Sequence, residues 1–445
     1  LLSAISFERH LHRSGQLEGR SVPGFGTLDI NNADGALDDW RSFAFDGRRV
    51  RLLLGGDRFR LADHRTVFDG TAERIEFDDD RIRLPLRDLQ VLFERPLQQS
   101  LYLGTGGSEG DAGLKGRPKP LCYGRCFHVP AVLIDAATLT YQVHDGQISG
   151  IDAVFDSGLA LSAGTEPPAP SHYAVDLAAG TFRLGSAPDG PVTAHVRGDA
   201  TGGAYAEDAA SLMLRIAMRA TGLSLIDWGA FAALTLAAPM AAGFFANQET
   251  GMLSALDSLA DSIGAHFGFN RQGQFTVGRL TEPSVTATES FDDSAIVSLE
   301  REPFALPIWR QKLGYARYWR PLSDGESAAA LGAEARSDLA ASHRYADASD
   351  PAIQIRHKLA GDTQKDGLLA TASDAGAEAA RRLALFGIAG DLFRVRVKTR
   401  PYSLSIGSTI RISYPRHGLA GGRNLVLAGL SEDSAFDEAE LTLWG

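Results

Sequence analysis

Cys122 and Cys126 are the only thiols in the chain, and thiols act as disulfide partners, metal ligands and nucleophiles. The segment around them is predicted to be extended, which would place their Cα atoms about 13 Å apart and beyond the reach of a disulfide. A metal site would need two more ligands, and no cysteine-peptidase motif surrounds either residue. We therefore expect two buried free thiols that pack as small apolar side chains.

The eleven histidines are scattered singly, apart from His10 and His12. On a strand these two would share one face, from which they could contact a metal ion. No third ligand stands near them in the sequence, and the HExxH zinc motif does not occur. We expect solvated or packed histidines, no metal site and no cofactor.

Acidic residues gather in places where carboxylates could act together. Asp29, Asn31 and Asp34 resemble the start of a calcium loop, but Asp34 stands where that loop needs glycine, and no distal glutamate follows. The sequence Asp78–Asp80 is typical of a solvated hairpin tip. A cell-wall hydrolase, an alternative function, would need an acid pair, which Asp78–Asp80 or Asp292-Asp293 could supply.

The glycine-rich segment Gly104–Gly113 invites comparison with phosphate-binding loops. It lacks the GK[ST] ending, because Lys115 is followed by Gly116, and Glu109 stands where GxGxxG needs its third glycine. The GxSxG nucleophile motif does not occur either. The sequence thus predicts a flexible loop, no catalytic, cofactor-binding or metal-binding residue, and a protein that is not an enzyme.

Composition limits the function further. A chain of 445 residues is long enough for two to four domains. With 44 basic and 55 acidic side chains, its formal charge of −11 argues against a nucleic-acid binder, since phosphate contacts need clustered Lys and Arg. The uncharged segment Trp228–Ala246 is broken by Gly229, Pro239 and Gly243 and predicts a buried helix followed by a strand, not a membrane span. The first residues do not resemble a signal peptide.

Short alternating segments between turn residues predict a mainly β fold with an α+β insert. In the first hundred residues, one strand is predicted at Phe25–Ile30. Two hairpins are predicted as well, Arg49–Leu54 with Phe59–Ala62 and Arg74–Phe77 with Arg81–Leu86. A short helix is expected within Leu86–Leu97. Further on, Thr138–Val143 and Gly150–Phe155 are expected to flank a turn at Asp145-Gly146.

The helical pattern begins after Glu207. Asp227 is expected to cap a helix at Trp228–Leu236, and Thr250 to cap the next one. A hairpin should follow, Ala265–Phe269 with Gln274–Leu280.

The last third is expected to return to strands around one helix. Ile353–His357 is expected to be extended, and Ser373–Phe386 to be a helix. Its inward residues are expected to be Ala377, Ala380, Leu383 and Ala384. On a late strand, Arg394, Arg396 and Lys398 alternate with Val395 and Val397, which predicts a half-solvated face.

The segment Lys115–Asp135 contains Gly116, Pro118 and Pro120, which favour an extended and stiff joint between domains, and Pro130, which suggests a sheet edge or bulge. The longer sequence GTGGSEGDAGLKGRPKPLCYGRCFHVPAVLIDAATLTYQVHDG resembles phage and prophage tail-tip proteins of the baseplate hub group. The resemblance extends over nearly the whole chain and ends in the closing ELTLWG.

This resemblance implies a structural virion protein at the tail tip. Three copies of the chain would form a homotrimeric ring around the channel for DNA ejection. Its partners would be a tail-tube or distal tail protein, tail fibre or receptor-binding proteins and the tape-measure protein, with assembly in the bacterial cytoplasm and no specific binding of the passing DNA. Acidic turns such as Asp78–Asp80 and Asp34–Asp39 would face the channel, and the basic residues of the late strand would face neighbouring subunits or solvent.

The implied domains are an N-terminal tube-like β-barrel module (1–120), a β-rich connecting domain (121–200), an α+β insert domain (201–284) and a C-terminal tube-like β-barrel module with a helix (285–445). A carbohydrate-binding tail adhesin is an alternative, since β modules often bind sugars through exposed aromatic rings. The aromatic candidates for it are Trp309, Tyr315 and Trp319.

Overall fold

The computed structural model describes residues 6–11, 22–56, 58–303, 305–398, 403–433 and 438–445. Strands outweigh helices, and several of the sheets curl into half-barrels. The predicted fold class, a multidomain and mainly β protein, is confirmed.

In the N-terminal β module, buried and half-buried side chains alternate strictly along one strand. In β6 (Arg81–Arg87, RIRLPLR), Ile82, Leu84 and Leu86 are buried, and the residues between them are half-buried. The predicted hairpin around Asp78–Asp80 is confirmed, since β5 (Glu76–Phe77) pairs with β6. The other strands of the module are β2 (Val22–Asn31), β3 (Arg49–Leu54) and β4 (Arg65–Ala72).

The predicted hairpin of Arg49–Leu54 with Phe59–Ala62 is wrong. Strand β3 pairs instead with β4, which buries Phe68 against Leu28 and the β6 side chains. All of residues 59–62 are exposed, so a strand there would have no apolar face to bury. The expected helix before Pro96 is a single 3-10 segment, Leu89–Phe93.

The C-terminal β module closes the chain. Its alternation in β24 (Asp391–Val397) is as predicted, because Arg394 and Arg396 are exposed and Val395 and Val397 are buried. Its strands are β19 (Glu289–Phe291), β20 (Ile296–Pro303), β24, β25 (Thr409–Ile412), β26 (Arg423–Asp433) and β27 (Glu438–Trp444).

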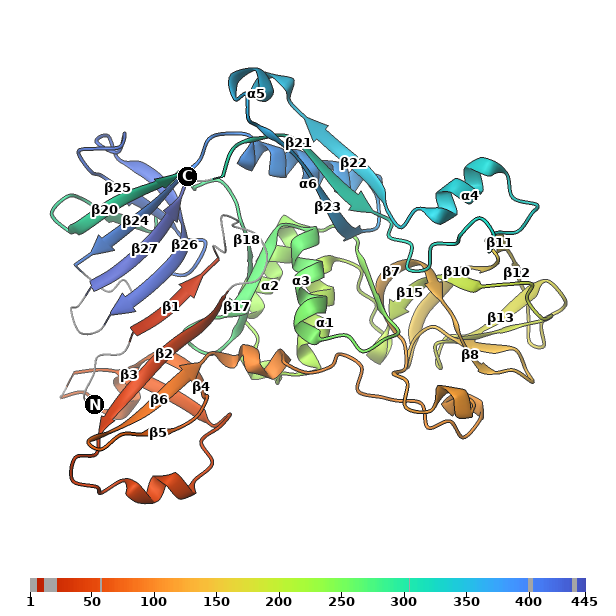
Figure 1. Ribbon diagram of the computed structural model, residues 1–445, viewed down its shortest axis with the longest axis horizontal. Coiled ribbons are helices and arrows are strands. Elements are labelled where there is room, and N and C mark those ends of the chain that lie inside the picture. The colour runs from red at the N-terminus through yellow and green to blue at the C-terminus, as the bar shows by residue number, and fades with distance from the viewer. Residues whose placement is uncertain (1–5, 12–21, 57, 304, 399–402, 434–437) are drawn as a thin grey trace.

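A single strand from the start of the chain joins the two modules. Strand β1 (Ser6–His10) pairs antiparallel with β26 on one side and with β2 on the other. The result is one sheet of twelve strands, with the main order β20-β24-β27-β26-β1-β2-β6-β4-β3. In Figure 1 the red strand β1 lies between the blue C-terminal module and the orange N-terminal one.

The centre of the molecule is an α+β core. Asp208 caps helix α1 (Ala209–Met218). Asp227 caps α2 (Trp228–Ala237) as predicted, and its carboxylate accepts a hydrogen bond from the Ala230 amide. The expected cap at Thr250 is wrong: Gly251 precedes α3 (Met252–Ser262), and the Thr250 hydroxyl donates to the Gln248 carbonyl. The hairpin of β17 (Ala265–Phe269) and β18 (Phe275–Arg279) forms as predicted.

Residues from the last third pack on this same core. They contribute Leu313, Leu368, Leu369, Ala375 and Ala379 to it. The elements are β21 (Ile308–Tyr315), α4 (Ala333–Ala340), β22 (Arg344–Ser349), α5 (Pro351–Arg356), β23 (Gly361–Leu369) and α6 (Ala372–Phe386). Within 285–445, residues 308–386 thus form a three-stranded sheet with helices, separate from the closing strands.

Two predictions in this region are wrong. Residues Ile353–Arg356 are helical because Asp350 caps α5 and Pro351 occupies its first position. In α6, Ala377, Ala380 and Ala384 are exposed, and Leu383 is half-buried. The opposite face is buried: Ala375, Glu378, Ala379, Arg382 and Leu385.

The segment between the N-terminal module and the core contains two five-stranded sheets. Strand β7 (Leu121–Pro130) lies inside the first sheet, next to its edge strand β16 (Gly243–Ala246), and Pro130 is the last residue of β7. The expected turn at Asp145-Gly146 does not close a hairpin, because β9 and β10 belong to different sheets. The strands are β8 (Val132–Asp135), β9 (Thr140–Gln142), β10 (Ile148–Asp156), β11 (Leu159–Ala160), β12 (Ser162–Ala163), β13 (His172–Asp176), β14 (Thr181–Leu184), β15 (Val192–Asp199) and β16 (Gly243–Ala246).

Candidate functional site

Both cysteines lie in β7 as free, buried thiols. Gly124 between them has φ +65, and a side chain there would collide with the Ala242 carbonyl. Burial, and next to it the neighbouring Cys126, raise the pKa of the Cys122 thiol well above its ordinary value. The thiolate is therefore disfavoured, and Cys122 is a core side chain and not a nucleophile.

The fold assembles a Cys–His–Asp arrangement from β7, the loop after β9 and the end of β15, and no sequence motif predicted it. The His144 Nδ1 accepts a hydrogen bond from the Cys122 backbone amide at 2.9 Å, and its Nε2 lies 3.7 Å from the Asp199 carboxylate. Burial alone would raise the pKa of Asp199, but hydrogen bonds from His144, Thr201 and Arg215 outweigh it and lower the pKa. Because the imidazole contacts the amide and not the thiol, the trio joins two strands and does not activate a nucleophile.

A second buried cluster, also missed, joins this sheet to the segment before α4. The ring of His128 lies 4.5 Å from that of His195 and 4.2 Å from that of Tyr318. Burial lowers the pKa of His128 to about 3 and of His195 to about 4. Both imidazoles are therefore neutral at physiological pH and serve as packed rings. Finding them from sequence would require knowing the strand register of β7 and β15.

The other candidate ligands remain apart. His10 lies in β1, and His12 falls outside the described residues. Asp29 is 3.5 Å from Arg83, and the carboxamide of Asn31 accepts from a turn amide. Among the residues that the structure describes, no three His, Cys, Asp or Glu side chains come together as a metal site would require.

The carboxylates proposed for hydrolysis lie in two different modules. Asp78–Asp80 forms the exposed β5–β6 tip, and Asp292 accepts from the amide and hydroxyl of Ser294 in the turn before β20. Those hydrogen bonds lower the pKa of Asp292. In the glycine-rich loop, Glu109 binds Lys119 at 2.7 Å.

The aromatic side chains considered for sugar binding are half-buried. Trp319 packs edge-on against Phe244 and Phe245, with the Arg317 guanidinium 4.0 Å above its ring. Tyr315 packs on the central core. Neither ring offers the exposed platform on which the adhesin alternative depends.

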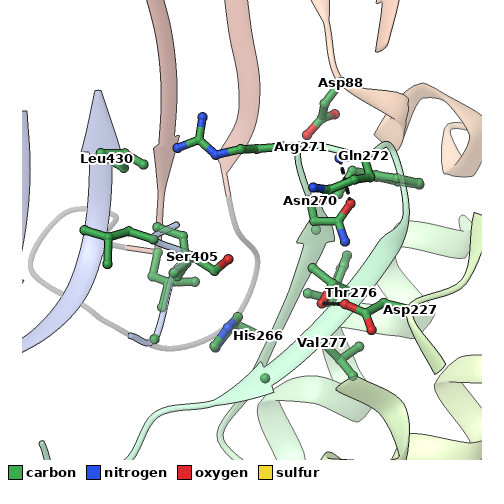
Figure 2. A pocket seen from close by; sticks show the side chains of 18 of the residues that line it. Asp88, Asp227, His266, Asn270, Arg271, Gln272, Thr276, Val277, Ser405 and Leu430 are labelled. Atoms are coloured by element: carbon green, nitrogen blue, oxygen red, sulfur yellow. Dashed lines mark hydrogen bonds between the residues drawn. The ribbon is translucent and has the colours of Figure 1, made fainter. Parts of the chain in front are cut away.

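A cavity of about 480 Å³ lies where the β17–β18 hairpin meets the joined sheet (Figure 2). Arg271 at the hairpin tip makes a buried, two-point ion pair with Glu432 of β26. On the same hairpin, Thr276 donates to Asp227 at 3.0 Å, and burial lowers the pKa of His266 to about 4. The Arg271–Glu432 ion pair connects the core to the sheet, and the arrangement is that of a joint between modules.

The joined sheet presents one charged face from edge to edge. Residues paired directly across an antiparallel sheet point to the same side. The register continues across nine strands, through β1 and β2. In the other seven strands the residues of this row are Ser298, Arg396, Glu440, Ser431, Arg87, Thr71 and Arg49. On this face Arg394 binds Glu302 at 2.9 Å, and Arg49 binds Asp69 at 2.7 Å. Basic side chains on the face are thus matched by acidic neighbours.

No family model matches the sequence, and no curated protein matches it. None of the helices in the described part of the chain has both the length and the apolar character needed to cross a membrane.

Solved structures that the fold resembles include phage and prophage tail proteins, a gene transfer agent virion and a component of a type VI secretion system. A tail protein from Neisseria meningitidis is 10% identical at a TM-score of 0.43, covering 100% of this chain and 92% of its own. The 43 kDa tail protein of prophage MuSo2 from Shewanella oneidensis is 10% identical at a TM-score of 0.41, covering 99% and 93%. A chain of the native gene transfer agent virion is 15% identical at a TM-score of 0.44, covering 80% and 91%. At these sequence identities and TM-scores, the similarity is limited to the overall course of the chain.

Proposed function

We propose that this chain is a structural hub component at the tail tip of a tailed phage or phage-like particle. In this proposal three copies form a ring that joins the tail tube to the host-contacting fibre proteins and surrounds the exit channel for DNA. The observation that carries the proposal is the strand β1, which makes one continuous sheet from β modules at opposite ends of the chain.

A continuous sheet of this kind is better suited to a subunit of a ring than to a protein that acts as an isolated domain. Two β modules per chain in a trimer present six modules, which matches a six-fold tail tube, and cyclic symmetry closes the ring without a free end. The remaining segments, the central α+β core and the two five-stranded sheets, then decorate its outside and offer surface to other tail proteins. The domain boundaries predicted from sequence belong to this proposal, with 308–386 grouped with the central core.

The charge pattern also suits a wall along which DNA slides. Each phosphate that a Lys or Arg neutralises releases counterions and strengthens retention. On the charged sheet face, Arg394 and Arg49 already have carboxylate partners, and the chain as a whole carries −11. We place this face toward the channel, which differs from the sequence-based expectation that the basic strand residues turn away from it.

The proposed partners are a tail-tube or distal tail protein on one side of the ring, fibre or receptor-binding proteins on the other, and the tape-measure protein in the channel. Assembly takes place in the host cytoplasm, and the protein acts without catalysis. Imaging of purified particles with a tag on this chain tests the proposal: the tag should lie at the tail tip in three copies. A tag on the head or along the tube would contradict it.

A further inference from the structure

Helix α5 projects from one end of the sheet formed by β21, β22 and β23 (Figure 1). Four large aliphatic side chains are exposed on α5 and on the segments beside it, and we call them the α5 patch. They are Leu306, Ile355, Leu359 and Ile388, and their exposed fractions are 61%, 70%, 75% and 60% in that order. Contiguous exposure of large apolar side chains marks an interaction surface.

Both ends of residues 350–361, the segment that contains α5, are fixed to the start of β21. At the first end, the Asp350 amide donates a hydrogen bond to the Trp309 carbonyl at 2.9 Å. At the other end, the Gly361 amide donates to the Pro307 carbonyl at 3.0 Å. Leu306 directly precedes Pro307, so the second bond brings it close to the end of this segment.

Helix α5 also contacts the end of α6. A Cβ added to Gly387 would lie 2.7 Å from the Ile353 side chain, and Ile388 is the next residue. Ile355 follows Ile353 by two positions and therefore points about 200° around the helix from this contact. The fold thus holds the α5 patch in place, and its side chains remain exposed among the residues that the structure describes.

Positive charge borders the patch on α5. Arg356 and Lys358 are exposed, and neither forms an ion pair with another described residue. The nearby carboxylates are engaged elsewhere: Asp350 accepts a hydrogen bond from an amide at the start of α5, and Asp362 lies 3.9 Å from Lys312.

A further positive charge lies beyond Ile388. Three residues on, the carboxylate of Asp391 is shared by two arginines, Arg301 at 2.6 Å and Arg423 at 3.3 Å. One carboxylate neutralises one guanidinium, so one positive charge is left over. The border of the patch is therefore basic, in a chain whose formal charge is −11.

An aliphatic surface with a basic border is complementary to an acidic amphipathic helix. Such a helix presents Leu or Ile at positions i, i+3, i+4 and i+7 to the patch and Asp or Glu to the border. A second copy of this chain fits less well, because its exposed Leu54 and Leu61 are bordered by the exposed arginines Arg58 and Arg65. An anionic lipid surface also fits less well, because the net negative charge of the whole chain opposes its approach.

We propose that the α5 patch is the docking surface for an acidic amphipathic helix of a different protein. Ile355 and Leu359 are the apolar anchors, and Arg356 and Lys358 pair with carboxylates along the edge of that helix. This contact is independent of ring formation, so its failure would leave the proposed function standing.

The test uses the purified full-length chain and a fluorescent peptide with leucine at i, i+3, i+4 and i+7 and glutamate elsewhere. Fluorescence anisotropy measures its binding beside that of a scrambled peptide and of a peptide with lysine in place of glutamate. We expect the acidic amphipathic peptide alone to bind. Its binding should weaken as salt rises from about 0.1 M to 1 M, which shortens the Debye length from about 10 Å to 3 Å. Equal binding of all three peptides would overturn the proposal.

Variants then locate the contact. Leu359→Asp, and Arg356→Glu together with Lys358→Glu, should each weaken binding of the acidic peptide about tenfold or more, since each removes an anchor or its charge partner. The charge-reversed variant should in turn bind the lysine peptide, a gain that misfolding cannot produce. Leu236→Asp, 84% exposed on α2, and Arg416→Glu, exposed before β26, are matched controls and should bind like the wild type. Equal loss in a control variant would contradict the location.

A photo-crosslinking experiment on purified particles identifies the natural occupant. A benzophenone maleimide is attached to Leu359→Cys, while the native thiols, Cys122 and Cys126, are buried. We expect a cross-link to a different protein, within a segment rich in Asp and Glu that carries Leu or Ile at helical spacing. A cross-link to another copy of this chain, no cross-link at all, or binding to phosphatidylserine vesicles that Leu359→Asp abolishes would each overturn the proposal.

Discussion

Replacing Glu378 by glutamine should destabilise the central core strongly. The side chain is fully buried on α6 and accepts hydrogen bonds from Arg279 of β18, from Arg381 at 2.7 Å and from Arg382 at 2.7 Å. Arg382 is fully buried as well. Glu378→Gln keeps the shape of the side chain but leaves these guanidinium groups without their shared counter-charge.

The magnitude follows from two independent lines. Breaking a buried ion pair by removing one partner costs about 3–5 kcal/mol. Burial alone would raise the pKa of Glu378, but Arg381, Arg382 and Arg279 lower it from 4.5 to about 2, which corresponds to about 3 kcal/mol favouring the carboxylate. This contribution is present above pH 4.5 and is lost as pH falls through the folded-state pKa of about 2.

Urea unfolding, followed by hydrogen exchange at α6 and β18, measures the effect. We expect the free energy of unfolding of the core to fall by about 3 kcal/mol or more, while exchange in the N-terminal β module stays unchanged. Glu334→Gln, an exposed change on α4, should leave the unfolding curve in place. A loss below about 1 kcal/mol, the scale of an exposed pair, would refute the reasoning.

Three further outcomes are expected. Burial lowers the pKa of His128 and His195 in the folded state, so the unfolded chain binds more protons below pH 6.5. The melting temperature should therefore fall as pH drops from about 6.5 toward 4. His195→Phe should flatten that decline, and an equal decline in the variant would count against this explanation. Replacing Pro118 and Pro120 by glycine should cost about 0.4–1 kcal/mol each and reduce particle yield more than domain stability, so wild-type yield from the double variant would argue against a rigid joint. Alanine at Cys122, Cys126, His10 and His12 together should leave particles assembled and infectious, and normal particles without infectivity would show that one of these side chains has a chemical role.

Local patterns predicted the elements well wherever one side of a segment is buried. The alternation of β6 and β24 and the cap at Asp227 were visible in the sequence because each depends on neighbours within a few residues. The α6 face was predicted from apolar residues alone, and it failed because Glu378 and Arg382 are buried as an ion pair with partners from β18. No local pattern identifies a charged residue that a distant strand will neutralise.

The long-range features required the fold. Strand β1 is only five residues long, and its partners Phe25 and Ser431 are more than four hundred residues apart in the sequence, in two different modules. The sequence suggested two flanking β modules but held no information on their joining. The clusters around His144 and His128 were missed for the same reason, since strand register brings their members together.

The most direct test of the central claim is a reconstruction of the tail tip from images of purified particles. The account predicts a closed ring with three copies of this chain and a channel wall on which arginines are paired with carboxylates. A closed assembly of another symmetry, or a channel lined continuously by unpaired Lys and Arg side chains, would contradict it.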